Sequence, residues 1–126
     1  MKVIDVVCGV VFNEEGKILI CQRKDLNLKW EFPGGKIKKN ETVNLSIIRE
    51  LYEELSVEVE PVEILFKNLY KSYNLIFVKC NFLRGEIILN DHLNFMWVNH
   101  YELVNYDFLD GDKKFVKHLT SNEINK

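Results

Sequence analysis

Acidic side chains recur at helical spacing in the middle of the chain. Glu50, Glu53 and Glu54 stand at positions i, i+3 and i+4, so in a helix their carboxylates fall within an arc of about 100°. Like charges at this spacing repel each other and lower helix stability. A solvated face tolerates that repulsion, whereas a bound divalent cation removes it, because Mg²⁺ takes carboxylate oxygens as ligands. The spacing therefore predicts either a solvated acidic face or a magnesium site.

The residues that surround this acidic group favour the metal site. The string runs Gly35, five residues, Glu41, seven residues, Arg49-Glu50, and then Glu53-Glu54. Glutamate-rich helices are common on protein surfaces, so Glu53-Glu54 alone would indicate a solvated face. Six specified identities at roughly 7% each arise by chance at about 10⁻⁷ per starting point. The whole string therefore indicates a functional constraint.

The segment from Gly35 to Val57 resembles the Nudix box, G-x5-E-x7-R-E-U-x-E-E-x-G-U, in which U is a bulky aliphatic residue. Every specified position matches except the last glycine, which is Ser56 in this chain. The preceding residues, Trp30 to Lys36 (WEFPGGK), are similar to the MutT branch of that family, the pyrophosphohydrolases of 8-oxo-dGTP and related nucleoside triphosphates. A serine in the left-handed conformation that glycine favours at a helix C-terminus costs about 1 kcal/mol.

The resemblance implies a Mg²⁺ site, with Mn²⁺ as a substitute, built by the box and by one acidic residue downstream of it. The implied catalytic residues are Arg49, Glu50, Glu53, Glu54 and Asp91. The implied metal ligands are the backbone carbonyl of Gly35 and the side chains of Glu50, Glu53, Glu54 and Asp91. Glu50 would be a ligand, the base that activates water, or both. Arg49 would orient carboxylates, with Glu41 as its partner.

A second group of residues is expected to bind the nucleotide. Its members are Arg23, Phe32, Gly34, Lys36, Tyr73 and Asp112. Arg23 and Lys36 would neutralise phosphate, with a solvated surface charge as the alternative. Phe32 and Tyr73 could stack on a base, although aromatic residues of a sheet more often belong to the core. Asp112 would face the base edge or, alternatively, serve as a helix N-terminal acid favoured by the helix dipole.

The function implied by the resemblance is hydrolysis of a nucleoside triphosphate to a monophosphate and pyrophosphate. Both 8-oxo-dGTP and CTP or dCTP remain open as substrates. Polyphosphate repels a nucleophile, and Mg²⁺ neutralises it and eases deprotonation of water, which a carboxylate then completes. A dinucleoside polyphosphate or nucleoside diphosphate-sugar hydrolase is an alternative. A non-catalytic Nudix module that senses a nucleotide is another, disfavoured because every box carboxylate is retained.

Composition limits the class of protein. The 126 residues predict one domain, residues 1–126, with the box at residues 35–57. A net charge of −2 and a pI of about 5.9 predict no binding of a nucleic-acid polymer. Three cysteines without a C-x-x-C spacing predict buried, reduced thiols. No window has the apolar length of a membrane span, so we expect a cytoplasmic monomer or homodimer that binds a nucleotide and no membrane.

The order of strands and helices predicts an α/β chain, a mixed sheet with helices on both faces, and the resemblance implies the Nudix fold, an α/β/α sandwich around a central mixed β-sheet. Residues 3–12 and 17–21 read as a strand hairpin, and residues 30–32 as a short extended piece ended by Pro33-Gly34-Gly35. Residues 42–56 read as a helix whose Leu45, Ile48, Tyr52 and Leu55 pack on the sheet. Further strands are expected at residues 62–69, 73–82 and 95–98, and a last helix at residues 110–120.

Overall fold

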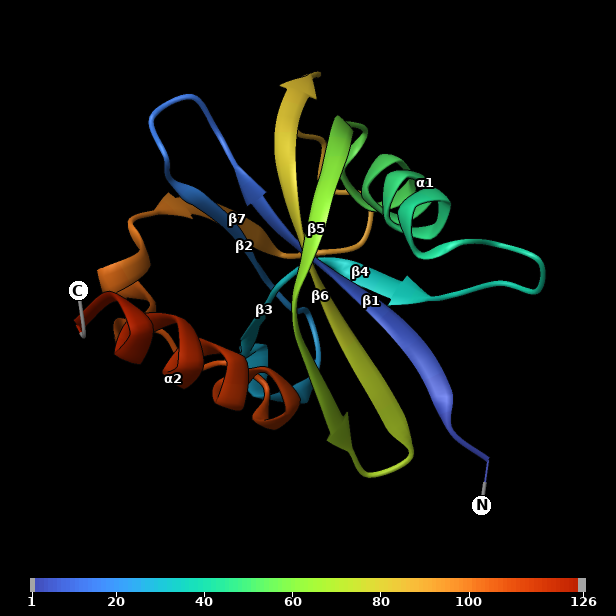
Figure 1. The fold of residues 1–126 in the computed structure, drawn as a ribbon. Helices are drawn as coiled ribbons and strands as arrows, with labels where there is room; N and C mark the ends of the chain where they lie inside the picture. The colour runs from blue at the N-terminus through green and yellow to red at the C-terminus, as the bar shows by residue number, and fades with distance from the viewer. Residues whose placement is uncertain (1, 125–126) are drawn as a thin grey trace.

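A seven-stranded mixed sheet forms the centre of the protein in the computed structural model, which describes residues 2–124 (Figure 1). The strands are β1 (Ile4–Phe12), β2 (Ile18–Gln22), β3 (Trp30–Glu31), β4 (Gly34–Lys36), β5 (Glu58–Tyr70), β6 (Tyr73–Arg84) and β7 (Asn94–Val98). The helices are α1 (Val43–Leu55) and α2 (Asp110–Ile124), with short 3-10 turns η1 (Leu26–Leu28) and η2 (His100–Asn105). The expected strands and helices occur in the expected order, and β4, η1 and η2 are additional.

The sheet is mixed because β1 and β6 run parallel while the other pairs are antiparallel. The order of neighbours is β3-β2-β1-β6-β5, with β4 paired to β1 and β7 paired to β2. The predicted hairpin of β1 and β2 is confirmed. Because β4 lies directly beside the central strand β1, it carries the glycine segment to the middle of the molecule.

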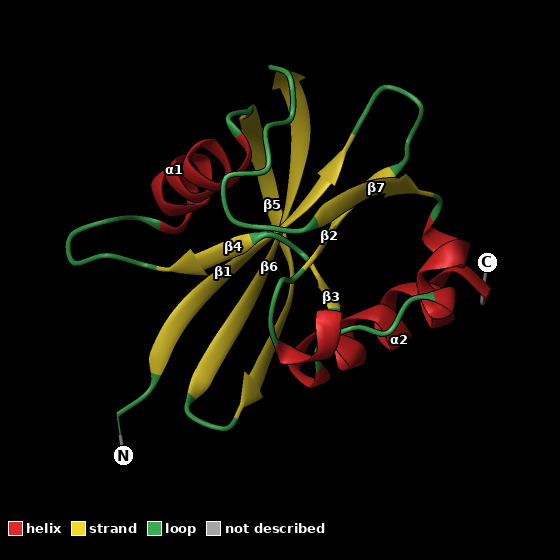
Figure 2. Ribbon diagram, turned by 180° about the vertical axis from the view of Figure 1, so that it is seen from behind, coloured by secondary structure: helices red, strands yellow, loops and turns green. Residues whose placement is uncertain are grey.

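The two helices cover opposite faces of the sheet, as the views from the two sides show (Figures 1 and 2). Alternate residues of β1 divide between two cores, since neighbouring side chains of a strand point to opposite faces. Val7 and Val11 belong to the core under α1, whereas Cys8 and Val10 belong to the core under α2. The predicted sandwich with a central mixed sheet is confirmed.

The predicted packing face of α1 was largely wrong. Leu45, Ile48 and Tyr52 are 57%, 38% and 62% exposed. Of the predicted residues only Leu55 is buried, and it forms the buried stripe with Ile47 and Leu51, at spacing i, i+4 and i+8. The helix has two apolar stripes about 100° apart, and sequence periodicity does not tell which one faces the sheet. Burial of the second stripe turns Glu50 and Glu54 toward β4.

The glycine pair that was expected to break the chain lies in a strand. Gly34 and Gly35 pair with Cys8 and Val7 across the β1–β4 ladder. A Cβ on Gly34 would lie 1.9 Å from the carbonyl oxygen of Val7, so only glycine permits this close approach of two backbones. Packing between the two strands therefore requires glycine at position 34, and both glycines continue the strand.

The two ends of α1 are fixed by side chains. The Thr42 hydroxyl accepts a hydrogen bond from the Leu45 N–H at 3.1 Å, which caps the N-terminus. Ser56 ends the helix in the left-handed conformation, with φ 60° and ψ 32°. Its Oγ accepts a hydrogen bond from Asn90 Nδ2 at 3.1 Å. The serine that replaces the family's glycine therefore accepts a hydrogen bond from Asn90, in the segment between β6 and β7, and this bond offsets part of its backbone strain.

Strand β5 begins earlier than expected, at Glu58 instead of residue 62, and forms one edge of the sheet. Pro61 lies within it, as an edge strand permits. The β5–β6 ladder is irregular at three places, between Glu58 and Val59, between Pro61 and Glu63, and between Ile64 and Phe66. Neither described helix is both long and apolar enough to cross a membrane.

Candidate active site

Glu50 and Gly35 are in direct contact, as the predicted metal site requires. A Cβ built on Gly35 would lie 2.5 Å from Cδ and Oε2 of Glu50. The contact follows from the fold, because α1 packs against β1 and β4 through Ile47 and Leu51. Glycine at this position leaves room for the Glu50 carboxylate beside the strand. The backbone of Gly35 and the side chain of Glu50 therefore come together at one point.

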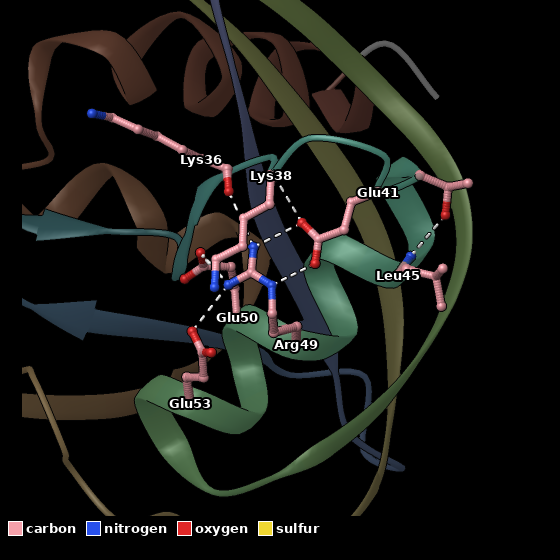
Figure 3. Close-up of polar contacts among 8 residues, drawn as sticks. Lys36, Lys38, Glu41, Leu45, Arg49, Glu50 and Glu53 are labelled. Atoms are coloured by element: carbon pink, nitrogen blue, oxygen red, sulfur yellow. Dashed lines mark hydrogen bonds and ion pairs between the residues drawn. The ribbon is translucent and has the colours of Figure 1, made fainter.

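Arg49 binds three acidic side chains, those of Glu41, Glu50 and Glu53 (Figure 3). Its Nη1 donates to Glu50 Oε2 and Glu53 Oε1, both at 3.0 Å, and its Nη2 donates to Glu41 Oε1 at 2.9 Å. The hydrogen bond from Arg49 lowers the pKa of Glu41 to about 2. The predicted contact between Arg49 and Glu41 is therefore present. In Figure 3 the Lys36 side chain extends away from this cluster.

Glu54 faces the sheet and is strongly perturbed. Burial, followed by the negative charges of Glu31, Glu50 and Asp91, raises the pKa of Glu54 to about 9. Its Oε1 is buried and accepts no hydrogen bond from any described residue. A buried carboxylate oxygen without a partner is unfavourable, and a cation beside it would relieve both the missing contact and the repulsion.

Asp91 lies in the segment between β6 and β7, and both of its neighbours are anchored. On one side, Asn90 Nδ2 donates to the Glu53 carbonyl at 2.9 Å, and the Asn90 N–H donates to the Glu54 carbonyl at 3.0 Å. On the other side, the buried His92 contacts Glu31 through Nε2 at 2.7 Å. Asp91 itself is exposed. The segment therefore holds this carboxylate near the C-terminal end of α1.

Arg23 is paired with acids, so the expected alternative of a merely solvated charge does not describe it. It donates to both oxygens of Asp25, at 2.6 and 3.1 Å, and to Glu31 Oε1 at 3.1 Å. These contacts raise the pKa of its guanidinium, so Arg23 stays charged. The residue lines a cavity of about 520 Å³ on the side of the sheet covered by α2.

This cavity has a mixed lining with an apolar majority. Its walls include Val6, Cys8, Leu75, Leu109 and the aromatic residues Tyr70 and Tyr73, and its charged groups are Arg23, Lys29, Lys71, Glu31, Asp110 and Asp112. Gly34 also lines it, beside the strand that carries Gly35. Ligand pockets are commonly apolar clefts of this size with a few polar groups. The cavity and the acidic face of α1 therefore meet at β4.

Asp112 is the most deeply buried acid of the cavity. Its Oδ2 accepts a hydrogen bond from the Phe32 N–H at 3.1 Å. Burial raises the pKa of Asp112 to about 7, partly opposed by that hydrogen bond. Asp112 also lies in the first turn of α2, so the alternative of a helix N-terminal acid fits its position as well, although its side chain is only 5% exposed.

Phe32 was expected to stack on a base or to belong to the core; the residue lines the cavity, and its ring fits the core alternative. Its side chain is 2% exposed, and its ring stacks on Phe108 with centroids 5.1 Å apart. Edge contacts with Phe77 and Phe115 complete its surroundings. The ring therefore belongs to the core under α2. Tyr73, by contrast, is half-buried and lines the cavity, so its predicted role is compatible with its position.

Lys36 is not among the residues that line the cavity, and its side chain is exposed. Its backbone carbonyl accepts a hydrogen bond from Arg49 Nη2 at 3.2 Å.

Glu31, His92 and Asn90 were not singled out for the site from the sequence, yet they join its parts. Their contacts connect residues that lie 34 to 61 positions apart, so local sequence carries no signal for them.

The acidic residues present fit a divalent cation. Hard cations such as Mg²⁺ take oxygen ligands and need negative charge nearby. The unpartnered Glu54 oxygen is an available ligand atom. The negative charge comes from four acidic side chains that repel one another, those of Glu31, Glu50, Glu54 and Asp91. Among residues 2–124, no three acidic, histidine or cysteine side chains already surround a single point. Arg49 instead holds Glu50 and Glu53, so ligation requires these carboxylates to turn from the guanidinium.

Comparison with known proteins identifies close similarities along nearly the whole chain. The profile described as NUDIX domain matches residues 2–119. The 8-oxo-dGTP diphosphatase of Buchnera aphidicola subsp. Schizaphis graminum is 30% identical over 124 residues, covering 94% of this chain and 95% of that protein. The CTP pyrophosphohydrolase of Escherichia coli K12 is 29% identical over 119 residues, covering 89% of this chain and 87% of that one.

Among solved structures, a MutT from work on Aliivibrio salmonicida and Vibrio cholerae superposes with a TM-score of 0.82 at 28% identity. The match covers 96% of this chain and 99% of that one. MutT from Methanosarcina mazei Go1 superposes with a TM-score of 0.79 at 20% identity, covering 97% and 96% of the two chains, which is a likeness of fold.

Proposed function

This chain belongs to the NUDIX family and is a Nudix pyrophosphohydrolase, and from that premise we propose that its substrate is a nucleoside triphosphate. The proposed reaction uses Mg²⁺ and gives a nucleoside monophosphate and pyrophosphate. The named activities of the relatives, on 8-oxo-dGTP and on CTP, support a triphosphate and leave its base open between the two. Nudix hydrolases use divalent metal ions; the choice of Mg²⁺, with Mn²⁺ as a substitute, is part of the proposal.

One observation carries the proposal: a nucleoside-sized cavity opens beside the strand on whose other side the box carboxylates stand. Gly34 lines the cavity of about 520 Å³, and the next residue, Gly35, contacts Glu50. A nucleoside bound in the cavity would project its phosphates over β4 toward α1. The fold therefore offers a place for the base on one side of β4 and a place for the phosphates on the other.

The residues of the chain divide the work. Glu50, Glu53, Glu54, Asp91 and the Gly35 carbonyl would hold Mg²⁺. When bound, the ion would neutralise phosphate charge and make an attacking water easier to deprotonate. A free carboxylate of the group would accept the water proton. Arg49 would keep the carboxylates oriented, and Arg23 would balance phosphate charge.

Base recognition would fall to the far end of the cavity. Asp112, when protonated, offers both a donor and an acceptor to the edge of a base, and Tyr73 offers a ring for stacking. Both a purine and a pyrimidine have edges with donors and acceptors, so this chemistry fits 8-oxo-dGTP and CTP alike. The three buried free cysteines support the further proposal that the enzyme works in the reducing cytoplasm.

A nucleotide panel tests the proposal. We expect wild-type protein with MgCl₂ to release pyrophosphate from CTP, dCTP, dGTP or 8-oxo-dGTP, with an equimolar monophosphate. Glu53→Gln should reduce the rate by roughly 10²-fold or more, since it removes a charged ligand, and EDTA should abolish turnover. Release of inorganic phosphate instead of pyrophosphate, or cleavage of only dinucleoside polyphosphates or nucleotide sugars, would refute it. A nucleotide-dependent rise in melting temperature without any cleavage would indicate a sensing module.

A further inference from the structure

Glu31 connects side chains of two chain segments whose backbones also meet where β2 pairs with β7. It lies on the two-residue strand β3, and its side chain is largely buried. Oε1 accepts a hydrogen bond from Arg23 at 3.1 Å, and Oε2 contacts His92 Nε2 at 2.7 Å. Arg23 follows strand β2, whereas His92 directly follows Asp91. One carboxylate therefore fixes a cavity residue and the neighbour of a candidate metal ligand.

The position of Glu31 is intermediate between the two halves of the site. It lines the nucleoside cavity, and its charge contributes to the raised pKa of both Glu54 and Asp112. The segment around Asp91 has two side-chain anchors, Asn90 on α1 and His92 on Glu31, and the Leu93 N–H donates to the Gln22 carbonyl at 2.8 Å. Without the Glu31 contact, His92 would lose its side-chain partner, and only backbone pairing with β2 would hold the segment on the side of β7.

We propose that Glu31 is a positioning residue that fixes Arg23 and the Asp91 segment together, so that nucleotide binding and metal binding depend on the same carboxylate. The inference rests on the proposed function, because Arg23 and Asp91 act there on phosphate and metal. Glu31 itself touches neither reacting group. Its two oxygens are both engaged by protein donors, which distinguishes it from Glu54 with its unpartnered oxygen.

The charge of Glu31 is needed as well as its shape. A carboxylate accepts at both oxygens, so it takes one hydrogen bond from Arg23 and one from the Nε2–H tautomer of His92. In Glu31→Gln the amide nitrogen would face either Arg23 or His92 Nε2. A change of tautomer would move the imidazole proton to Nδ1, which has no partner among the described residues. A buried donor without an acceptor is unfavourable, so the isosteric variant should still release the anchor.

The experiment compares binding with turnover in full-length protein. For wild type, Glu31→Gln and Glu31→Ala, calorimetry gives the dissociation constants of Mn²⁺ without nucleotide, and of CMP and dGMP with Mn²⁺ present. Pyrophosphate release gives kcat and KM for the best substrate of the panel. We expect Glu31→Gln to weaken both Mn²⁺ and monophosphate binding by about tenfold or more, the range found when a group supporting a metal ligand is removed.

Two controls separate positioning from general damage. Asp25→Asn removes another acceptor of Arg23 and leaves the contact between Glu31 and His92 in place, so it should weaken nucleotide binding and leave the Mn²⁺ constant unchanged. Glu58→Gln removes an exposed glutamate from its ion pair with Arg84 and should change neither constant. Thermal unfolding of each variant checks that the fold is retained.

The outcomes are distinct. Loss of both affinities in Glu31→Gln, with a retained melting transition, supports the proposal. A lower melting temperature with both constants unchanged, or loss of only one affinity, overturns it. If wild-type protein hydrolyses none of the triphosphates, the proposed function fails, but the binding constants still decide whether Glu31 couples the two sites. If Glu31→Ala does not fold, the Glu31→Gln comparison alone decides.

Discussion

Asp112 makes the stability of the protein fall as pH rises toward neutrality. Burial raises the pKa of Asp112 to about 7, whereas an aspartate in an unfolded chain has a pKa of about 3.9. Between these values the folded state holds a proton that the unfolded state has released. The free energy of unfolding therefore decreases from about pH 4 to about pH 7 and changes no further, for this group, above pH 7.

The size of the effect follows from the difference in pKa. About three pH units at 1.36 kcal/mol each give roughly 4 kcal/mol as the limit for a rigid site. Entry of water or rearrangement around the carboxylate lowers this, so we expect about 2–4 kcal/mol. Asp112→Asn removes the titration and keeps an oxygen that can accept from the Phe32 N–H. The variant should match wild type near pH 4 and be more stable by that amount at pH 8.

Urea denaturation followed by tryptophan fluorescence, at intervals from pH 4 to pH 8, measures the difference. Asp110→Asn is the matched control, because Asp110 is exposed and its pKa is lowered by the hydrogen bond from Lys113. Stability from a lowered pKa is present above the unfolded value and lost below it, so this variant should gain nothing at pH 8. A constant difference between Asp112→Asn and wild type from pH 5 to pH 8 would refute the reasoning.

Two further predictions concern the glycine pair and the end of α1. Gly35→Ala should lower pyrophosphate release by about 100-fold and leave the melting temperature nearly unchanged, because its Cβ would meet the movable Glu50 carboxyl. In Gly34→Ala the Cβ would meet the Val7 backbone instead. That variant should not fold, or should lose about 3 kcal/mol or more of unfolding free energy in urea denaturation. Equal loss of stability in both would contradict this. Ser56→Ala should lower the unfolding free energy by about 1 kcal/mol, because the acceptor for Asn90 is lost. In Ser56→Gly the relief of left-handed backbone strain should offset that loss to within about 0.5 kcal/mol. A large loss of stability in the glycine variant would show that strain plays no part.

The helix that carries the acidic residues was predictable because its signals are local. The Thr42 cap, the periodic apolar residues and the box identities all lie within one short segment, and α1 begins and ends within a residue of the expected bounds. Its packing face was not predictable, because Leu45 and Ile48 of the exposed stripe are as apolar as Ile47 and Leu51 of the buried one. Only the sheet beneath the helix selects between the two stripes, and the sheet is assembled from distant strands.

The connections between the parts of the site were beyond local sequence reasoning for the same reason. The contact of Phe32 with Asp112 spans 80 positions, and the contact of Glu31 with His92 spans 61. Gly34-Gly35 reads locally as a chain break, although pairing with β1 makes it a strand. Arg23 reads as a loop cation, although two acids hold it. For the glycine pair tertiary pairing overrides the local preference, whereas the acids that hold Arg23 lie only two and eight positions away from it.

The irregular ladder along β5 bears on how the protein behaves at high concentration. A regular outer strand presents a straight row of unpaired N–H and C=O groups, which is a template for growth into aggregates. Here Pro61 lacks an N–H, the register shifts at three places, and the exposed charges of Glu58, Glu60, Glu63 and Lys67 line the same strand. Such an edge gives an incoming chain no continuous partner, so molecules crowded together should resist intermolecular β-pairing there.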